Sequence, residues 1–77
     1  MDEAIAVLQQ AIKRSGEGRQ DGPDVRLALR SLRFVGVPND CLRYFWDSCI
    51  ADNQIGRSQG MNAALNRIEL FRAGKLK

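Results

Sequence analysis

Apolar residues recur at every third or fourth position in four stretches of the chain, which is the spacing of a helix with one apolar face. The longest uninterrupted repeat consists of Leu42, Phe45, Trp46, Cys49 and Ile50. The pattern predicts helices at about residues 2–15, 23–35, 38–52 and 59–73. These elements indicate a single all-α domain spanning residues 1–77, a compact bundle of about four short helices.

Glycine, proline and serine residues mark the expected ends of these helices. Gly16 is expected to cap the first helix at its C-terminus, and Pro23 suits the first turn of the second. Gly36 is expected to end the second helix, Ser58 to be the N-cap of the fourth, and Gly74 to close it. The remaining segments are expected to be a flexible loop at 16–22, a short turn at 53–57 and a frayed tail at 75–77.

The apolar faces of the second, third and fourth helices are expected to form the main core, with the first helix packing across them. Because Trp46 belongs to the strongest repeat, we interpret it as a core anchor and not as a platform for a ligand. The core-facing stripe of the second helix consists of Val25, Ala28, Leu29, Leu32 and Val35. The expected centre of the core consists of Leu32, Phe45, Trp46, Ile50, Leu65 and Ile68.

The composition argues against catalysis. The 77 residues include no histidine, which excludes a Ser-His-Asp triad and a Cys-His pair. Cys41 and Cys49 are too few for a zinc site or a disulfide scaffold, so we expect free thiols and a reducing compartment. Asp40 and Asp47 lie too far apart on one helix to act as a catalytic carboxylate pair. We therefore expect no enzyme activity, no bound metal and no cofactor.

The net charge of +3 is unevenly distributed along the chain. Residues 1–25 carry five acidic and three basic residues, a net charge of −2. Residues 26–77 carry nine basic and four acidic residues, a net charge of +5. Nine of the twelve basic residues are arginine, a side chain that suits bidentate contacts with carboxylate or phosphate. A charge of +3 does not by itself indicate nucleic-acid binding.

The second helix carries a second apolar stripe opposite its core-facing one. Leu27 and Phe34 lie on this opposite side, and arginines occupy the flank between the two stripes. A helix that is apolar on two sides is either sandwiched within its own fold or presents one side to a partner. Apolar anchors with an arginine rim favour a protein interface, with another protein or with a second copy of the chain. The candidate interface consists of Leu27, Phe34, Arg26, Arg30, Arg33, Tyr44 and Leu70.

Residues 28–46 allow a second interpretation. They form a helix, then Gly36 and Val37, then a second helix with apolar residues at Leu42 and Phe45. Glycine permits the positive φ of a tight turn, and Val37 would fill the angle between the helices. The arrangement resembles the helix-turn-helix motif, although Leu32 replaces its usual small residue and Asp40 would face phosphate groups. The resemblance implies DNA contacts through Asn39, Arg43, Tyr44 and Arg33.

The sequence thus favours a small non-enzymatic regulator, adaptor or inhibitor that acts through a protein interface, with a helix-turn-helix DNA-binding regulator as the alternative. We expect no membrane association, because the chain contains no run of about 18 apolar residues. The acidic start, Asp2 and Glu3, is unlike a signal peptide and disfavours anionic lipid. The expected location is the cytoplasm.

Overall fold

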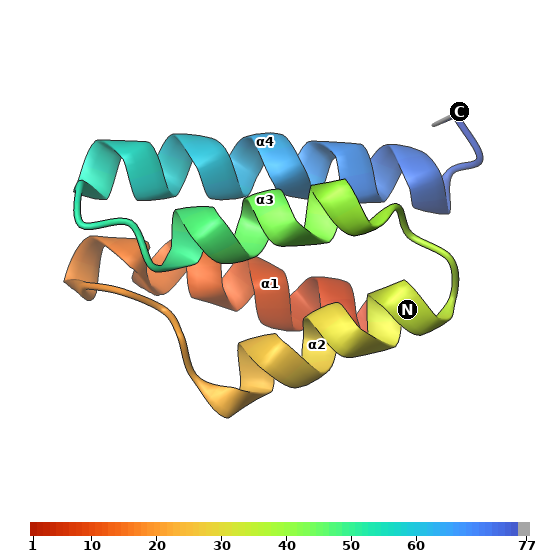
Figure 1. Cartoon of the computed structure of the whole chain (residues 1–77), viewed down its shortest axis with the longest axis horizontal. Helices are drawn as coiled ribbons and strands as arrows, with labels where there is room; N and C mark the ends of the chain where they lie inside the picture. The colour runs from red at the N-terminus through yellow and green to blue at the C-terminus, as the bar shows by residue number, and fades with distance from the viewer. Residues whose placement is uncertain (76–77) are drawn as a thin grey trace.

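The structure, a computed structural model, describes residues 1–75, and all its regular secondary structure over that range is helical. The elements are α1 (Asp2–Arg14), the short 3-10 helix η1 (Ser15–Glu17), α2 (Pro23–Phe34), α3 (Asn39–Cys49) and α4 (Gln54–Arg72). Successive α-helices run in opposite directions across the view in Figure 1. The predicted all-α bundle of four helices is confirmed.

The helices pack mainly as two pairs. α3 packs along α4, and α1 packs along α2 and also contacts α4, whereas α2 and α3 make few contacts with each other. Leu8 and Ala11 of α1 are completely buried, because this helix meets neighbours on two sides. The expectation of a core made by the last three helices, with α1 merely lying across it, is therefore wrong. Because α2 and α3 pair weakly, a shallow groove lies between them.

Most of the predicted core is buried. Leu32, Phe45 and Ile68 have no exposed surface, and Leu65 is only 8% exposed. Trp46 and Ile50 are partly buried and pack against the core at its edge, so the prediction that they belong to its centre is wrong.

Val35 is a second correction to the predicted core, because 52% of its surface is exposed. α2 ends at Phe34, one residue earlier than predicted, so Val35 follows the helix as its C-cap and does not continue the buried stripe. The turn itself agrees with the sequence. Gly36 adopts a φ of 102°, its N–H donates to Arg33 O, and that of Val37 donates to Leu32 O at 3.1 Å. Val37 is 3% exposed, so it fills the angle between the helices as predicted.

α4 begins four residues before the predicted N-cap. The side chain of Asn53 accepts a hydrogen bond from the backbone N–H of Gly56 at 2.9 Å, so Asn53 is the N-cap and Ser58 lies inside the helix. At the other end Gly74 adopts a φ of 74°, and the N–H of Lys75 donates to Leu70 O at 2.8 Å. Lys75 is therefore part of the helix cap and not of a frayed tail. Residues 76 and 77, for which fraying was also predicted, lie outside the described residues.

The segment that follows α1 is shorter and better fastened than a free loop. Gly16 does not cap α1; η1 continues the chain as a 3-10 turn, and Gly18 takes the positive φ of 139°. The backbone N–H of Gln20 donates to Cys49 O at 3.0 Å. Its side-chain amide donates to Arg14 O and Gly18 O. The segment is thereby attached to the ends of both α1 and α3. α3 itself starts one residue later and ends three residues earlier than predicted.

Arg57, on the first turn of α4, is buried without a carboxylate partner among the described residues. Its surface is 6% exposed, and its guanidinium donates only to backbone carbonyls. Nε and Nη2 donate to Ser15 O at 3.1 and 2.9 Å. Nη1 donates to Ala51 O and Asp52 O at 2.9 and 3.0 Å. Because carbonyls at helix C-termini carry partial negative charge, this cation joins the ends of α1 and α3 to the start of α4.

α3 and α4 approach each other closely at Gly60. This glycine is buried, and a Cβ placed there would overlap Ser48 and lie 3.2 Å from the ring of Tyr44. The hydroxyl of Ser48 is already engaged, because it donates to Tyr44 O at 2.8 Å. The absence of a side chain at residue 60 therefore sets the distance between the two helices.

Candidate protein-binding surface on α2

The second apolar stripe of α2 faces outward. Phe34 is 91% exposed and Leu27 is 61% exposed, so neither side chain belongs to the core. Of the two interpretations that the sequence leaves open for this stripe, sandwiching within the fold is thus excluded. The other, a side presented to a partner, remains a proposal. Burial of a phenylalanine side chain contributes about 1.5–3 kcal/mol, and the exposed Phe34 does not make this contribution to the stability of the fold.

Leu27 and Phe34 border two different shallow pockets. Leu27 lines a pocket of about 320 Å³ between α1 and α2, together with Val7, Glu3 and Asp24 among others. Phe34 lines a second one of about 370 Å³ with Val35, Arg30 and Ser31. The stripe therefore has a mildly acidic end near the start of α2 and a basic end near its C-terminus.

The three arginines on the flank of α2 have different surroundings. The guanidinium of Arg26 lies over the ring of Trp46 at 5.3 Å from its centre, a cation–π contact that joins α2 to α3. Arg30 and Arg33 are exposed, and neither forms an ion pair with any other residue of the range 1–75. Arg26 thus contributes to the fold, while Arg30 and Arg33 remain available to a ligand.

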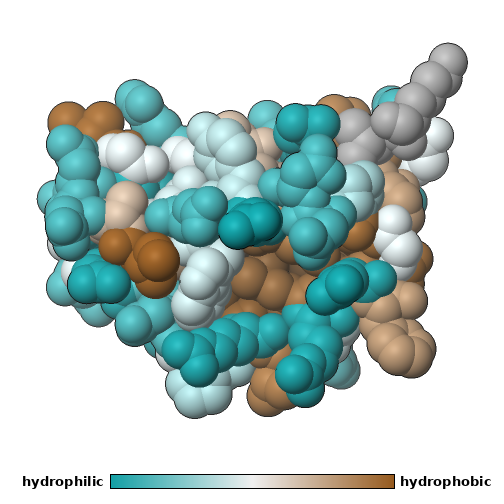
Figure 2. Space-filling model, viewed as in Figure 1, coloured by the Kyte–Doolittle hydropathy of each residue, from teal (hydrophilic) through white to brown (hydrophobic). Residues whose placement is uncertain are grey.

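A groove between α2 and α3 brings together residues from both sequence interpretations. This groove, hereafter the α2–α3 groove, has a volume of about 330 Å³. Figure 2 shows apolar surface between the two helices, bordered by strongly hydrophilic residues. The floor of the groove is formed by the side chains of Leu29 and Leu42 and is therefore apolar. Both leucines are largely buried, at 9% and 4% exposed, so this apolar floor is small. The polar lining consists of Arg30, Arg33, Asn39 and Arg43.

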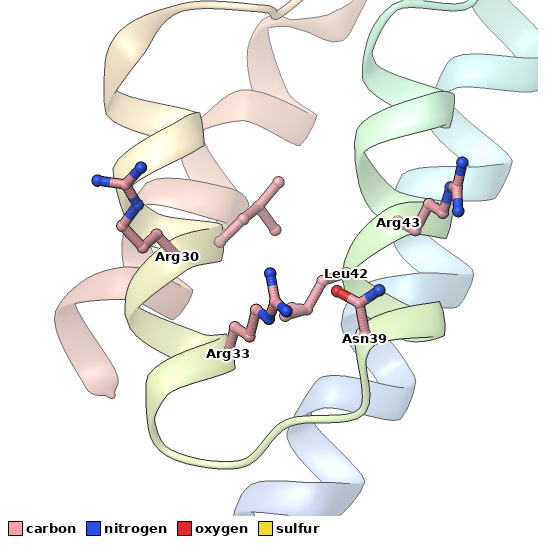
Figure 3. Close-up of a pocket in the computed structure, with 6 residues that line it drawn as sticks. Arg30, Arg33, Asn39, Leu42 and Arg43 are labelled. Carbon is pink, nitrogen blue, oxygen red and sulfur yellow. The ribbon is translucent and has the colours of Figure 1, made fainter.

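The arrangement of these side chains is visible in Figure 3. Arg33 extends from α2 into the gap, towards Leu42 and Asn39 of α3. Arg30 and Arg43 point away from the gap on its two sides. The residues that line the groove thus include three arginines and no acidic residue, but only the guanidinium of Arg33 lies in the gap. Such a groove attracts anionic groups while its floor offers contact to an apolar side chain.

Two predicted interface residues lie apart from these pockets. Tyr44 is 55% exposed and lines a pocket of about 430 Å³ between α3 and α4, with Asp47 and Gly60. Leu70 is 44% exposed on α4. Conversely, sequence reasoning did not identify Leu29 and Leu42 as the base of a groove. Their apolar spacing indicated the core, and no periodic signal shows that a buried residue also borders an open groove.

The thiol of Cys49 is not activated as a nucleophile. Cys41 and Cys49 are free, as the sequence predicted, and both are buried. Burial, and secondly the negative charge of Asp21, raise the pKa of Cys49 to about 12, so its thiol is protonated at neutral pH. Over residues 1–75, no three side chains of the metal-ligating types gather into a possible metal site. Within the same range, no helix is both long and apolar enough to cross a bilayer.

Comparisons with protein-family models, with curated proteins and with solved structures find no match for this chain.

Proposed function

We propose that this protein is a small non-enzymatic regulator, adaptor or inhibitor that binds a partner protein through the outer face of α2. The observation that carries the proposal is the exposure of Phe34, at 91% the most exposed large apolar residue in the described chain. Leu27 extends the apolar surface, and Arg30 and Arg33 supply the basic rim that protein interfaces favour.

The proposal is tested by capture of partners from an extract of the cells that produce the protein. Three immobilised baits are compared by quantitative mass spectrometry: the wild type, Phe34→Ser and Ile55→Ser. Ile55 is a matched control because it is 68% exposed at the start of α4, away from α2. A partner should be retained by the wild type and by Ile55→Ser and lost by Phe34→Ser. If all three baits retain the same proteins, α2 is not the binding surface.

DNA binding is the second candidate, and one observation favours it. Arg33, Asn39 and Arg43, which the helix-turn-helix resemblance singles out, line the same groove. Asp40, exposed on the first turn of α3, opposes a phosphate there. Fluorescence anisotropy with a duplex at two salt concentrations tests this candidate, since phosphate contacts make affinity fall steeply with salt. The absence of binding at low salt would exclude it.

A further inference from the structure

We infer that the partner segment recognised by this protein is an acidic amphipathic helix, which places an apolar side chain in the α2–α3 groove and carboxylates against its arginines. The inference rests on the proposed function and specifies the chemistry of its partner. It is carried by two properties of the same groove, the apolar floor and the uncompensated positive rim.

The floor identifies the kind of side chain that fits. Leu29 and Leu42 form its base, and the groove has a volume of about 330 Å³. An apolar side chain of a partner would cover this floor and exclude water from it. A phosphodiester backbone offers charge but no apolar group for this position. The floor therefore favours a protein ligand over a nucleic acid.

The rim identifies the charge of the ligand. Arg33 reaches into the groove, Arg30 and Arg43 extend outward from its two edges, and none of them is paired with a carboxylate of the described chain. A planar guanidinium accepts a carboxylate in a bidentate arrangement, so glutamate or aspartate side chains are matched to each of these positions. The three arginines outnumber the one exposed acidic residue beside them, Asp40 on the first turn of α3, so the net positive charge still attracts an acidic segment from a distance at low salt.

Arg30 connects the groove to the exposed end of the stripe. It lines both the α2–α3 groove and the pocket that contains Phe34 and Val35. A ligand lying along α2 therefore contacts the groove and the exposed phenylalanine at the same time. Since α2 has 12 residues, a helix of similar length, about 18 Å, spans both.

A second copy of the chain is a poorer occupant of this surface. Two copies related by a two-fold axis through the groove would place the same three arginines opposite one another. Like charges at the centre of an interface oppose association unless anions intervene. The charge of the groove thus favours a different, acidic protein.

The test uses two fluorescent helical peptides of about 14 residues, each with leucines spaced to form one apolar face. In the first peptide glutamates flank the leucines, and in the second these glutamates are replaced by glutamines. Anisotropy titrations with the full protein at about 50 and about 300 mM salt should show at least about tenfold tighter binding of the acidic peptide at low salt. This preference should shrink at high salt.

Two variants locate the binding site. The double substitution Arg33→Gln/Arg43→Gln should weaken binding of the acidic peptide by about tenfold and leave the glutamine peptide unaffected. Arg67→Gln is the matched control, because Arg67 is an exposed arginine of α4 that lines neither pocket of α2. It should leave both affinities unchanged. Circular dichroism of each variant confirms that the fold is retained.

Four results would overturn the inference. Equal affinity for both peptides would show that the partner is recognised without acidic groups. The proposed function would be unaffected by that result, because it is tested separately by the capture experiment with Phe34→Ser. Failure of both peptides to bind at about 1 mM would show that the groove does not recognise an amphipathic helix. The proposed function would then be decided by the capture experiment alone. Tighter binding of a DNA duplex than of the acidic peptide would assign the arginines to phosphate. A stable dimer that the double substitution dissociates would assign the groove to a second copy.

Discussion

Replacement of Arg57 by methionine is expected to destabilise the protein by about 3–5 kcal/mol. Methionine matches the aliphatic part of the side chain but removes the guanidinium. In the native structure this group makes four hydrogen bonds, to Ser15 O twice and to Ala51 O and Asp52 O once each. The substitution would leave these three carbonyls without that cation at the ends of α1 and α3.

The magnitude follows from the geometry. A hydrogen bond to a charged group contributes about 1.5–3 kcal/mol, but bonds made by one group are not additive. Two of the four bonds converge on Ser15 O, and the carbonyls near Ala51 can regain water, so we count about two full bonds. A domain of 77 residues has a total stability of roughly 4–12 kcal/mol, so this loss removes a large part of it.

The assay is urea unfolding at 25 °C, followed by helix circular dichroism and by the fluorescence of Trp46, the single tryptophan. In a parallel thermal unfolding experiment, the midpoint temperature of Arg57→Met should lie at least about 12 °C below that of the wild type. Arg67→Met serves as the control, since Arg67 is exposed on the same helix and should change stability by less than about 0.5 kcal/mol. A loss below about 1 kcal/mol for Arg57→Met would refute the argument that this cation holds the three helix ends together.

Arg57→Lys separates charge from shape. An ammonium group keeps the positive charge near the two helix ends, but it lacks the planar fork that reaches Ser15 O and Ala51 O together. We therefore expect the lysine variant to lie between wild type and methionine in stability. If lysine restored full stability, the contribution of Arg57 would be that of a point charge alone.

Three further predictions concern single positions. Gly60→Ala should lower the free energy of unfolding by more than about 2 kcal/mol, because its methyl group would overlap Ser48. Gly56→Ala is the control and should not destabilise by that mechanism, because Gly56 is exposed and a Cβ there would have Asn53, at 3.7 Å, as its nearest contact. Thermal unfolding of the two variants compares the effects. Asn53→Ala should cost about 1 kcal/mol by loss of the N-cap bond to Gly56, measured by urea unfolding. The pKa of the Cys49 thiol is 9.0 in the unfolded chain and about 12 in the native state, so above pH 9.0 only the unfolded state loses this proton. The free energy of unfolding should therefore fall between pH 9.0 and about 12, and it should fall less in Cys49→Ala. A fall of equal size in both proteins would contradict this prediction.

The periodicity of the sequence predicts the existence of the four helices because each has one strongly buried face. Leu32, Phe45 and Ile68 are buried as the pattern requires. Gly36 is also predictable, since a tight turn after a helix needs a positive φ that glycine adopts easily. These signals are local, and each is read within a few residues of its own element.

The errors have longer-range causes. The burial of Arg57 depends on carbonyls that lie up to 42 residues away in the chain, so no local pattern identifies it. Trp46 belongs to an apolar stripe, but its neighbour on α2 is the exposed Arg26 and not an apolar side chain. The ring therefore lies at the edge of the core and is only half-buried. The start of α4 was misplaced because Ser58 and Asn53 are both good capping residues, and only the structure shows which one is used.

The candidate interface was partly predictable for the same reason. The angle between Leu27 and Phe34 and the core-facing stripe predicts a second apolar side of α2, but only the structure shows that this side is exposed and not sandwiched. The α2–α3 groove is not predictable in this way, since Arg43 joins Arg30 and Arg33 only because α2 and α3 pair weakly with each other. Helix pairing is decided by the packing of all four helices, which periodicity within one helix does not report.

The net charge becomes informative only when each arginine is assigned to its partner. Arg57 is bonded to helix ends and Arg26 lies over Trp46, so both act within the fold. Arg72 pairs with Asp2 at 2.8 Å on the surface, so its charge is partly compensated within the chain. The arginines that line the α2–α3 groove have no such intramolecular partner in the described chain. Positive charges that have no partner within the fold, next to the exposed ring of Phe34, are the physical basis for proposing an acidic and partly apolar ligand at this surface.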